Sequence, residues 1–320
     1  MLPLLLVLGV MLGCGGEGDA STEPSAQVTP EAASFPAPAG RSLEQIATDE
    51  AGELSNDLVA SPAGRVSRPG KNRFGFGMFT VAREQIDDAE VAVYAAHGAE
   101  GDARGPYPAR LERLATEGAF TSKTSSGDPD AITGIYVTDL ELPKRGEWRL
   151  LALVRDGGSL VATRMPSIEV KSYARIPAVG EKAPQIHTPT AEDVGLITEI
   201  ETRQPPDTMH EVDFADALGE RPIVLLFATP ALCQSRVCGP VVDVAEQVKN
   251  EFEPDEVAFI HMEVYRENLI DNGVRPQLRA FGLRTEPWLF VIDREGRVSK
   301  AIEGGFSADE LDRAVQKVVG

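Results

Sequence analysis

Hydrophobic residues recur with a period of two through much of the first half of the chain. From Ser61 to Val170, several segments rich in β-branched and aromatic residues alternate apolar and polar positions, which is typical of strands with one face in a core. Turn sequences separate these segments, and no clear helical pattern lies between them. We therefore predict an all-β sandwich at residues 61–172. The segments are 73–79, 89–96, 134–142, 147–154 and 159–165.

The pattern changes after a Pro- and Gly-rich linker that begins at Tyr173. The run IVLLFAT, at 223–229, is apolar up to its last residue, as expected of a strand buried on both faces. Residues 241–252 place apolar side chains along one helical stripe, and a capping box at Ser307 and Glu310 opens a last helix. With a second strand, a short helix and a hairpin in between, this order predicts an α/β layer with a mixed sheet.

The amino terminus carries an apolar run at residues 2–13. About a dozen residues are too few for a membrane-spanning helix, which needs about 20, but they match the core of a signal peptide. The run ends in Met-Leu-Gly-Cys14, which resembles the bacterial lipobox, whose Cys becomes the lipidated first residue of the mature protein. We therefore predict a signal peptide with a lipobox at 1–14 and lipidation of Cys14. An ordinary secretory peptide is the alternative, because no Lys or Arg precedes Arg41.

The residues after Cys14 are mostly Gly, Ala, Ser, Pro and Thr with a few acids. Such a composition buries too little apolar surface to offset the entropy of ordering the chain. We predict a disordered tether at residues 15–60. The expected location is the cell envelope, outside the cytoplasm and lipid-anchored to the membrane, where a disulfide can persist.

The charge of the chain limits the partners it can have. Of its 320 residues, 50 are Asp or Glu and 31 are Lys or Arg, which gives a net charge of −19. Binding to nucleic acid or to an anionic lipid surface relies on clustered Lys and Arg. We therefore expect no nucleic-acid partner, and contact with a membrane only through the lipid anchor.

Two cysteines, Cys233 and Cys238, lie where the strand at 223–229 passes into a helix. A helix amino terminus favours the thiolate, which is the attacking species in disulfide exchange. In a regular helix, residues five apart have Cα atoms about 8 Å apart, too far for a disulfide, which needs about 7 Å or less. Gly239-Pro240 favours a helix that starts near Cys238 and leaves Cys233 in the preceding loop. We therefore expect the pair to be within disulfide reach.

Several motifs near the carboxy terminus carry a family resemblance. FGLRTEP at 281–287 is similar to the thioredoxin stretch Tyr-Gly-Ile-Arg-Gly-Ile-Pro, and PWLFVIDREGRV at 287–298 to a run of the TlpA/ResA-like branch. The resemblance covers residues 177–320 and implies a thioredoxin fold there, although 199–222 has no counterpart. The all-β region at 61–172 looks like the immunoglobulin-like domains of bacterial secreted proteins.

The thioredoxin resemblance implies an extracytoplasmic thiol-disulfide oxidoreductase. It would act on protein thiols and disulfides, with an unidentified redox partner and no cofactor beyond the cysteines. Cys233 is expected to attack and Cys238 to resolve, although the reverse order stays open because Cys238 lies nearer the helix dipole. The resemblance also implies a cis bond between Glu286 and Pro287 beside the dithiol. A carboxylate at Glu286 is expected to raise the thiol pKa and make the pair a reductant.

Three other functions share features of this sequence. One class of peroxiredoxins has the same Cys-x4-Cys spacing, but its catalytic Arg falls where this chain has Pro287. A Sco-like copper chaperone needs a His near Thr285, where none occurs, and His261 is expected to pack within a strand. The last alternative is a non-catalytic, tethered binding protein in which Cys233 and Cys238 form a purely structural disulfide.

Overall fold

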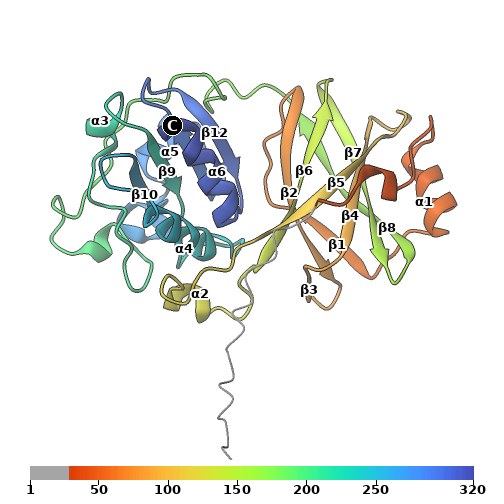
Figure 1. Cartoon of the computed structure of the whole chain (residues 1–320), viewed down its shortest axis with the longest axis horizontal. Helices are drawn as coiled ribbons and strands as arrows, with labels where there is room; N and C mark the ends of the chain where they lie inside the picture. Colours follow the sequence, from red (N-terminus) through yellow and green to blue (C-terminus); the bar gives the residue numbers. More distant parts are fainter. Residues whose placement is uncertain (1–28) are drawn as a thin grey trace, which may run out of the picture.

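The computed structural model describes residues 29–320 and folds them into an all-β part followed by an α/β part (Figure 1). The predicted signal peptide, Cys14 and residues 15–28 of the predicted tether lie outside the described residues. Within the described range, no helix is both long and apolar enough to cross a membrane.

The all-β part is one continuous sheet of eight strands. Neighbouring strands are antiparallel, in the order β1-β2-β6-β5-β4-β7-β8, and β3 pairs with β2 at the side. The prediction of an all-β region is therefore confirmed. The strands are β1 (Leu58–Pro62), β2 (Gly70–Thr80), β3 (Gln85–Ile86), β4 (Glu90–His97), β5 (Arg104–Arg113), β6 (Gly134–Leu142), β7 (Gly146–Asp156) and β8 (Ser159–Val170).

This sheet nearly closes on itself, so the prediction of a sandwich with two separate sheets is wrong. Strand β5 connects the two halves, because residues 104–109 pair with β4 and residues 110–113 pair with β6. The two edge strands also meet, since Thr163 Oγ1 on β8 donates to the Leu58 carbonyl on β1 at 3.0 Å. Alternating strand patterns predict which face is buried but not which strands pair, and the pairing decides between a sandwich and a near-barrel.

A helix packs on this sheet within the segment predicted to be a tether. α1 (Leu43–Ala51) begins with a capping box formed by Ser42 and Gln45, and Ile46 is fully buried with Tyr94. A 3₁₀ turn, η1 (Ala32–Ser34), precedes it. The prediction of disorder up to residue 60 is therefore wrong for the described residues from Ala32 onward. The capping box and the helical spacing of the apolar residues after Ser42 were the available signals.

The α/β part contains a four-stranded mixed sheet in the order β10-β9-β11-β12. β9 is parallel to β10 and antiparallel to β11, which forms a hairpin with β12. This is the strand order of the thioredoxin fold, as the resemblance implied. The strands are β9 (Ile223–Phe227), β10 (Ala258–Met262), β11 (Trp288–Ile292) and β12 (Val298–Glu303).

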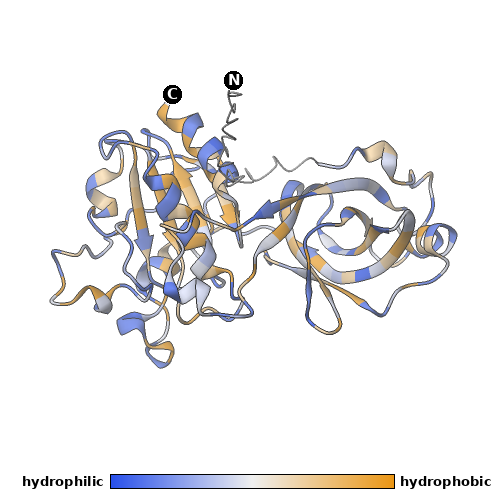
Figure 2. Ribbon diagram, turned by 60° about the horizontal axis from the view of Figure 1, so that its bottom comes forward, coloured by the Kyte–Doolittle hydropathy of each residue, from blue (hydrophilic) through white to orange (hydrophobic). Residues whose placement is uncertain are grey.

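Helices cover both faces of this sheet (Figure 1). One core lies under α4 and α6, and the other under α3 and α5. Hydrophobic residues accordingly concentrate on the central strands, where every residue of β9, β10 and β11 is buried (Figure 2). The helices of this part are α3 (Phe214–Ala217), α4 (Cys238–Lys249), α5 (Pro276–Ala280) and α6 (Ala308–Val319), with 3₁₀ turns η2 (Ile197–Glu199), η3 (Arg266–Asn268) and η4 (Ile270–Asn272). One further short helix, α2 (Lys123–Ser126), lies in the loop between β5 and β6 of the all-β part.

Polar side chains join the two parts where β2 and β5 meet α6. Arg73 on β2 forms an ion pair of 2.6 Å with the buried Glu310 on α6 and also donates to the Gly305 carbonyl at 2.8 Å. The Ser307 hydroxyl, at the start of α6, donates to Glu112 on β5. These buried contacts fix the all-β part against the helix that follows the hairpin.

Candidate functional site

Cys233 and Cys238 form a disulfide at the junction between β9 and α4, with Cα atoms 5.9 Å apart. Cys238 is the first residue of α4 and is fully buried, whereas Cys233 lies in the preceding loop and is partly exposed. The expectation that the helix starts at Cys238 and that the pair is within disulfide reach is confirmed. Cys233 is therefore the more accessible member of the pair.

The loop between the cysteines supplies polar groups to the Cys233 sulfur. Ser235 Oγ lies 3.2 Å from Cys233 Sγ, where its hydroxyl can donate a hydrogen bond. Val237, the residue before α4, has an apolar side chain that forms no capping hydrogen bond. It therefore does not occupy the first backbone amides of the helix. Arg236 adopts a left-handed φ of 57°, which turns the chain sharply back toward Cys238. The Ser235 hydroxyl and the amino terminus of α4 both favour a thiolate on Cys233.

A loop of the all-β part lies against the disulfide. We call residues 114–133, which connect β5 to β6 and contain α2, the cap segment. Asp128 of this segment forms an ion pair with Arg236, and the Ile132 amide donates to the Arg236 carbonyl at 3.2 Å. The cap segment also packs on the start of α4, where a methyl group added to Gly239 would lie 2.9 Å from Ser125 Oγ. Between them is a cavity of about 640 Å³ that Cys233 lines.

A buried ion pair holds the cap segment to α4. Asp243, one turn beyond Cys238, is 1% exposed and accepts hydrogen bonds from the Ser122 amide at 2.9 Å and the Ser122 hydroxyl at 3.1 Å. Its other oxygen accepts from Arg203 Nε at 2.7 Å. Arg203 in turn donates to the Phe120 carbonyl at 2.6 Å. The segment 199–222, which has no counterpart in the thioredoxin resemblance, therefore helps to position the cap over the dithiol.

The Glu286–Pro287 peptide bond is cis, as predicted. Trp288 pairs with Phe227 in the β11–β9 register, which places Pro287 beside the end of β9, where the loop that carries Cys233 begins. Glu286 is partly buried, and burial raises the pKa of its carboxyl. The influence of Glu286 on the cysteines stays a prediction.

Replacing Glu286 by glutamine tests that influence. If the carboxylate lies in the field of the dithiol, its removal lowers the pKa of the attacking cysteine and makes the reduction potential of the pair less negative. Thiol titration by alkylation rate and equilibration with glutathione measure the two quantities. Glu295→Gln, in the exposed hairpin turn between β11 and β12, is the matched control. Identical values for Glu286→Gln and the control would show that Glu286 has no such role.

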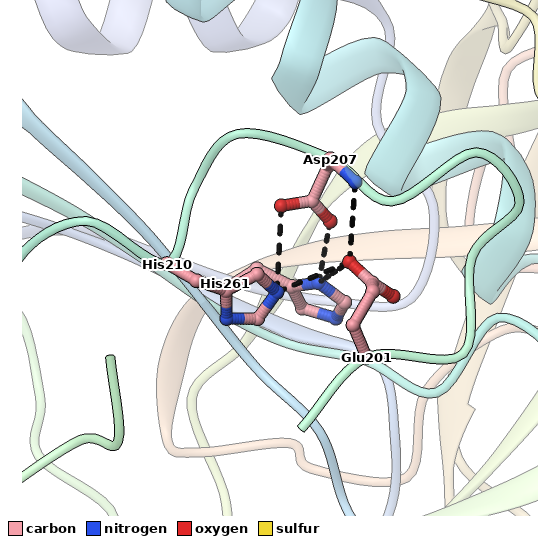
Figure 3. Close-up of side chains that lie close together, drawn as sticks. All are labelled: Glu201, Asp207, His210 and His261. Atoms are coloured by element: carbon pink, nitrogen blue, oxygen red, sulfur yellow. Dashed lines mark hydrogen bonds and ion pairs between the residues drawn. The ribbon is translucent and has the colours of Figure 1, made fainter. Parts of the chain in front are cut away.

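Four buried titratable side chains lie close together in the α/β part: Glu201, Asp207, His210 and His261 (Figure 3). We call them the His–carboxylate cluster. His261 lies in β10, as predicted, but its ring joins this cluster rather than only packing in the sheet. The other three residues come from the segment without a counterpart, and their irregular spacing gave no recognisable motif.

Within the cluster, the pKa of one side chain depends on the charges of its neighbours. Burial opposes ionisation of His261, but Asp207 and Glu201 outweigh it and raise the pKa of the His261 ring well above its usual range. Burial also opposes ionisation of Glu201, yet His261 and His210 hold the pKa of this carboxyl below its usual range. In this cluster, a neighbouring positive charge is therefore needed to keep a buried carboxylate ionised.

Comparison with known proteins gives structural matches of low score. A thiol:disulfide interchange protein of the thioredoxin family from Chlorobium tepidum TLS matches 47% of this chain and 100% of its own, at 20% identity and a TM-score of 0.32. A thioredoxin-like superfamily protein matches 45% of this chain and 97% of its own, at 16% identity and a TM-score of 0.31. No family model matches the chain, and no curated protein matches it. The fold assignment accordingly rests on the strand order described above.

Proposed function

We propose that this protein is a thiol-disulfide oxidoreductase that exchanges disulfides with other proteins through Cys233 and Cys238. The observation that carries the proposal is the disulfide at the amino terminus of α4, in which one cysteine is partly exposed and the other is buried. Exchange requires this asymmetry, because an incoming thiolate must reach one sulfur while the other serves as the leaving group. The Ser235 hydroxyl and the helix terminus supply the stabilisation that a reactive thiolate needs.

The exchange takes place in two thiolate attacks, each of which forms one disulfide bond and breaks another. In the dithiol form, the Cys233 thiolate attacks one sulfur of a substrate disulfide, which forms a mixed disulfide and releases one substrate thiolate. The Cys238 thiolate then attacks the Cys233 sulfur, which forms the internal disulfide and releases the second substrate thiolate. Two electrons pass to the substrate, and the protons lost by the dithiol end on the substrate thiols. The reverse sequence oxidises a substrate dithiol.

The cap segment favours an extended peptide as the substrate. The cavity beside Cys233 is bounded by Lys123, Asp128 and Pro129 on one side and by the loop before α4 on the other. A cavity of this kind admits a chain segment more readily than the surface of a folded domain. We extend the proposal to a protein disulfide carried on an exposed, extended segment.

The proposal includes an extracytoplasmic location with a lipid on Cys14. Its support is the apolar run and the lipobox-like sequence before Cys14, together with a disulfide that needs an oxidising compartment to persist. Labelling with a fatty-acid analogue tests it, because the label should be incorporated by the wild-type chain and lost in Cys14→Ser.

A redox titration of the full chain tests the activity. We expect the Cys233–Cys238 pair to equilibrate reversibly with glutathione buffers as a two-electron couple, and the reduced protein to cleave a disulfide-linked model peptide. Alkylation and mass measurement of the peptide that contains both cysteines report the oxidised fraction. A pair that stays oxidised in every buffer is a structural disulfide, which favours the non-catalytic alternative. Rapid consumption of hydrogen peroxide in place of peptide cleavage favours the peroxidase.

A further inference from the structure

The His–carboxylate cluster presents two nitrogen and two oxygen donors to one point in the interior (Figure 3). Glu201, Asp207 and His210 lie in the loop between η2 and α3, and His261 lies in β10. All four side chains are at most 3% exposed. One donor atom of each residue lies within 4.8 Å of those of the other three.

The distances between these donors are close to those between the ligands of a tetrahedral metal ion, with Asp207 meeting the two histidines through different oxygens. His261 Nδ1 lies 2.7 Å from Asp207 Oδ2 and 3.4 Å from Glu201 Oε2. His210 Nε2 lies 3.1 Å from Glu201 Oε2 and 3.5 Å from Asp207 Oδ1. Four ligands bound at about 2.0–2.1 Å in a tetrahedron are about 3.3–3.4 Å apart. The observed separations bracket this value, so small side-chain movements suffice to place a metal ion between the donors.

The surroundings of His261 orient it as metal-binding histidines are usually oriented. Its Nε2 lies 3.2 Å from the Ala228 carbonyl oxygen, which can only accept a hydrogen bond. The hydrogen of the neutral ring therefore belongs on Nε2, and the Nδ1 lone pair faces Glu201 and Asp207. A backbone carbonyl on the outer nitrogen is a common support for a ligating imidazole. In the charged ring a hydrogen on Nδ1 donates to Asp207 at 2.7 Å, and in the neutral ring a metal ion can take the place of that hydrogen between the two buried carboxylates.

A third carboxyl group lies beside the cluster, and burial raises the pKa of that group, Glu263. Glu263, two residues beyond His261, is 1% exposed, and its Oε1 accepts from the Thr202 hydroxyl at 2.6 Å. Among the described residues, Glu263 Oε2 has no hydrogen-bond partner, and neither has His210 Nδ1. The His210 ring is thus held only through the nitrogen that faces the cluster. Two buried carboxyl groups facing two imidazoles make a site whose charge a dication can offset.

We propose that Glu201, Asp207, His210 and His261 bind one divalent first-row transition-metal ion, for which Zn²⁺ is the best fit. Imidazole and carboxylate donors suit such ions, whereas Ca²⁺ and Mg²⁺ take six or more ligands, almost all oxygens. Four protein ligands complete a tetrahedral shell, which is typical of a structural site.

The metal ion joins the loop after η2 to the sheet near the dithiol. Thr202, in that loop, accepts a hydrogen bond from the Ala231 amide at 3.1 Å, two residues before Cys233. Arg203, in the same loop, reaches the Asp243 network that holds the cap segment. Loss of the ion is therefore expected to loosen both the loop and the base of the cap.

Metal loading of the full chain, with the Cys233–Cys238 disulfide kept oxidised, tests this site. After treatment with a chelator and its removal, we expect the protein to bind one Zn²⁺ per chain by elemental analysis. Co²⁺ in its place should give the intense visible absorption of a tetrahedral complex without a thiolate charge-transfer band, which excludes coordination by Cys14. Absence of the tetrahedral Co²⁺ spectrum in the wild-type protein overturns the proposal.

Two ligand variants and one control assign the site. Glu201→Gln and His210→Gln should weaken Zn²⁺ binding by at least about 100-fold, since even loss of an outer hydrogen-bond partner costs 10–100-fold. His187→Gln, whose side chain is 83% exposed, should bind as the wild type does. Unchanged affinity in both ligand variants overturns the assignment. If a variant fails to fold, X-ray absorption of the wild-type complex decides, because it must show two imidazole ligands and no sulfur.

Discussion

Replacing Cys233 by serine is expected to abolish thiol-disulfide exchange, with a rate loss of about three orders of magnitude or more. The reason is that Cys233 carries the accessible sulfur, whereas Cys238 is buried at the start of α4. The rate at which the reduced protein cleaves a disulfide-linked peptide measures the effect. Ser235→Ala is a milder comparison, because it removes only the hydroxyl beside the Cys233 sulfur and should slow exchange without ending it.

The Cys238→Ser variant separates the roles of the two cysteines. Without a resolving thiol, the mixed disulfide between Cys233 and the substrate should accumulate, and it should be visible as a mass increase equal to half of the disulfide-linked peptide. Cys233→Ser should accumulate no such adduct. An adduct on Cys238 in Cys233→Ser would reverse the assignment. Wild-type rates in both variants would be incompatible with the oxidoreductase proposal.

The elements around the dithiol could be predicted because their signals are local. The strand at 223–227 is apolar throughout, and Gly239-Pro240 indicates where α4 begins. The spacing of Cys233 and Cys238 then requires one cysteine outside the helix. Each of these conclusions depends on residues within one or two turns of each other, which is the range over which sequence patterns are informative.

The cap segment and the His–carboxylate cluster depend on contacts between distant residues. Ser122 and Asp243 are 121 positions apart, and His261 meets Asp207 across 54 positions. No period or spacing links such pairs, and each residue alone is an unremarkable polar position. The near-closed sheet was missed for the same reason, since its pairing is not encoded in any single strand.

The buried Glu310 is expected to make the junction between the all-β and α/β parts sensitive to acid. Its carboxylate is 4% exposed and lies 2.6 Å from Arg73, 3.4 Å from Lys300 and 3.5 Å from Arg110. Burial opposes its ionisation, but Arg73 together with Lys300 and Arg110 outweighs burial and lowers the pKa of Glu310 to about 2. Relative to an ordinary value of 4.5, this shift corresponds to about 3 kcal/mol of stabilisation when the group is ionised.

The pH dependence of that stabilisation follows from the sign of the shift. Because the pKa of Glu310 is lower in the folded state, its stabilisation is complete above about pH 4.5 and is lost as the pH falls towards 2. Glu310→Gln should therefore be less stable than the wild type by about 3 kcal/mol at pH 7, with a difference that shrinks between pH 4.5 and 2. Urea unfolding of both proteins across this range measures it. Asp309→Asn, an exposed neighbour on the same helix, should show no such difference. A Glu310→Gln deficit that stays constant from pH 7 to pH 2 would mean that side-chain packing, rather than the charge on Glu310, holds the two parts together.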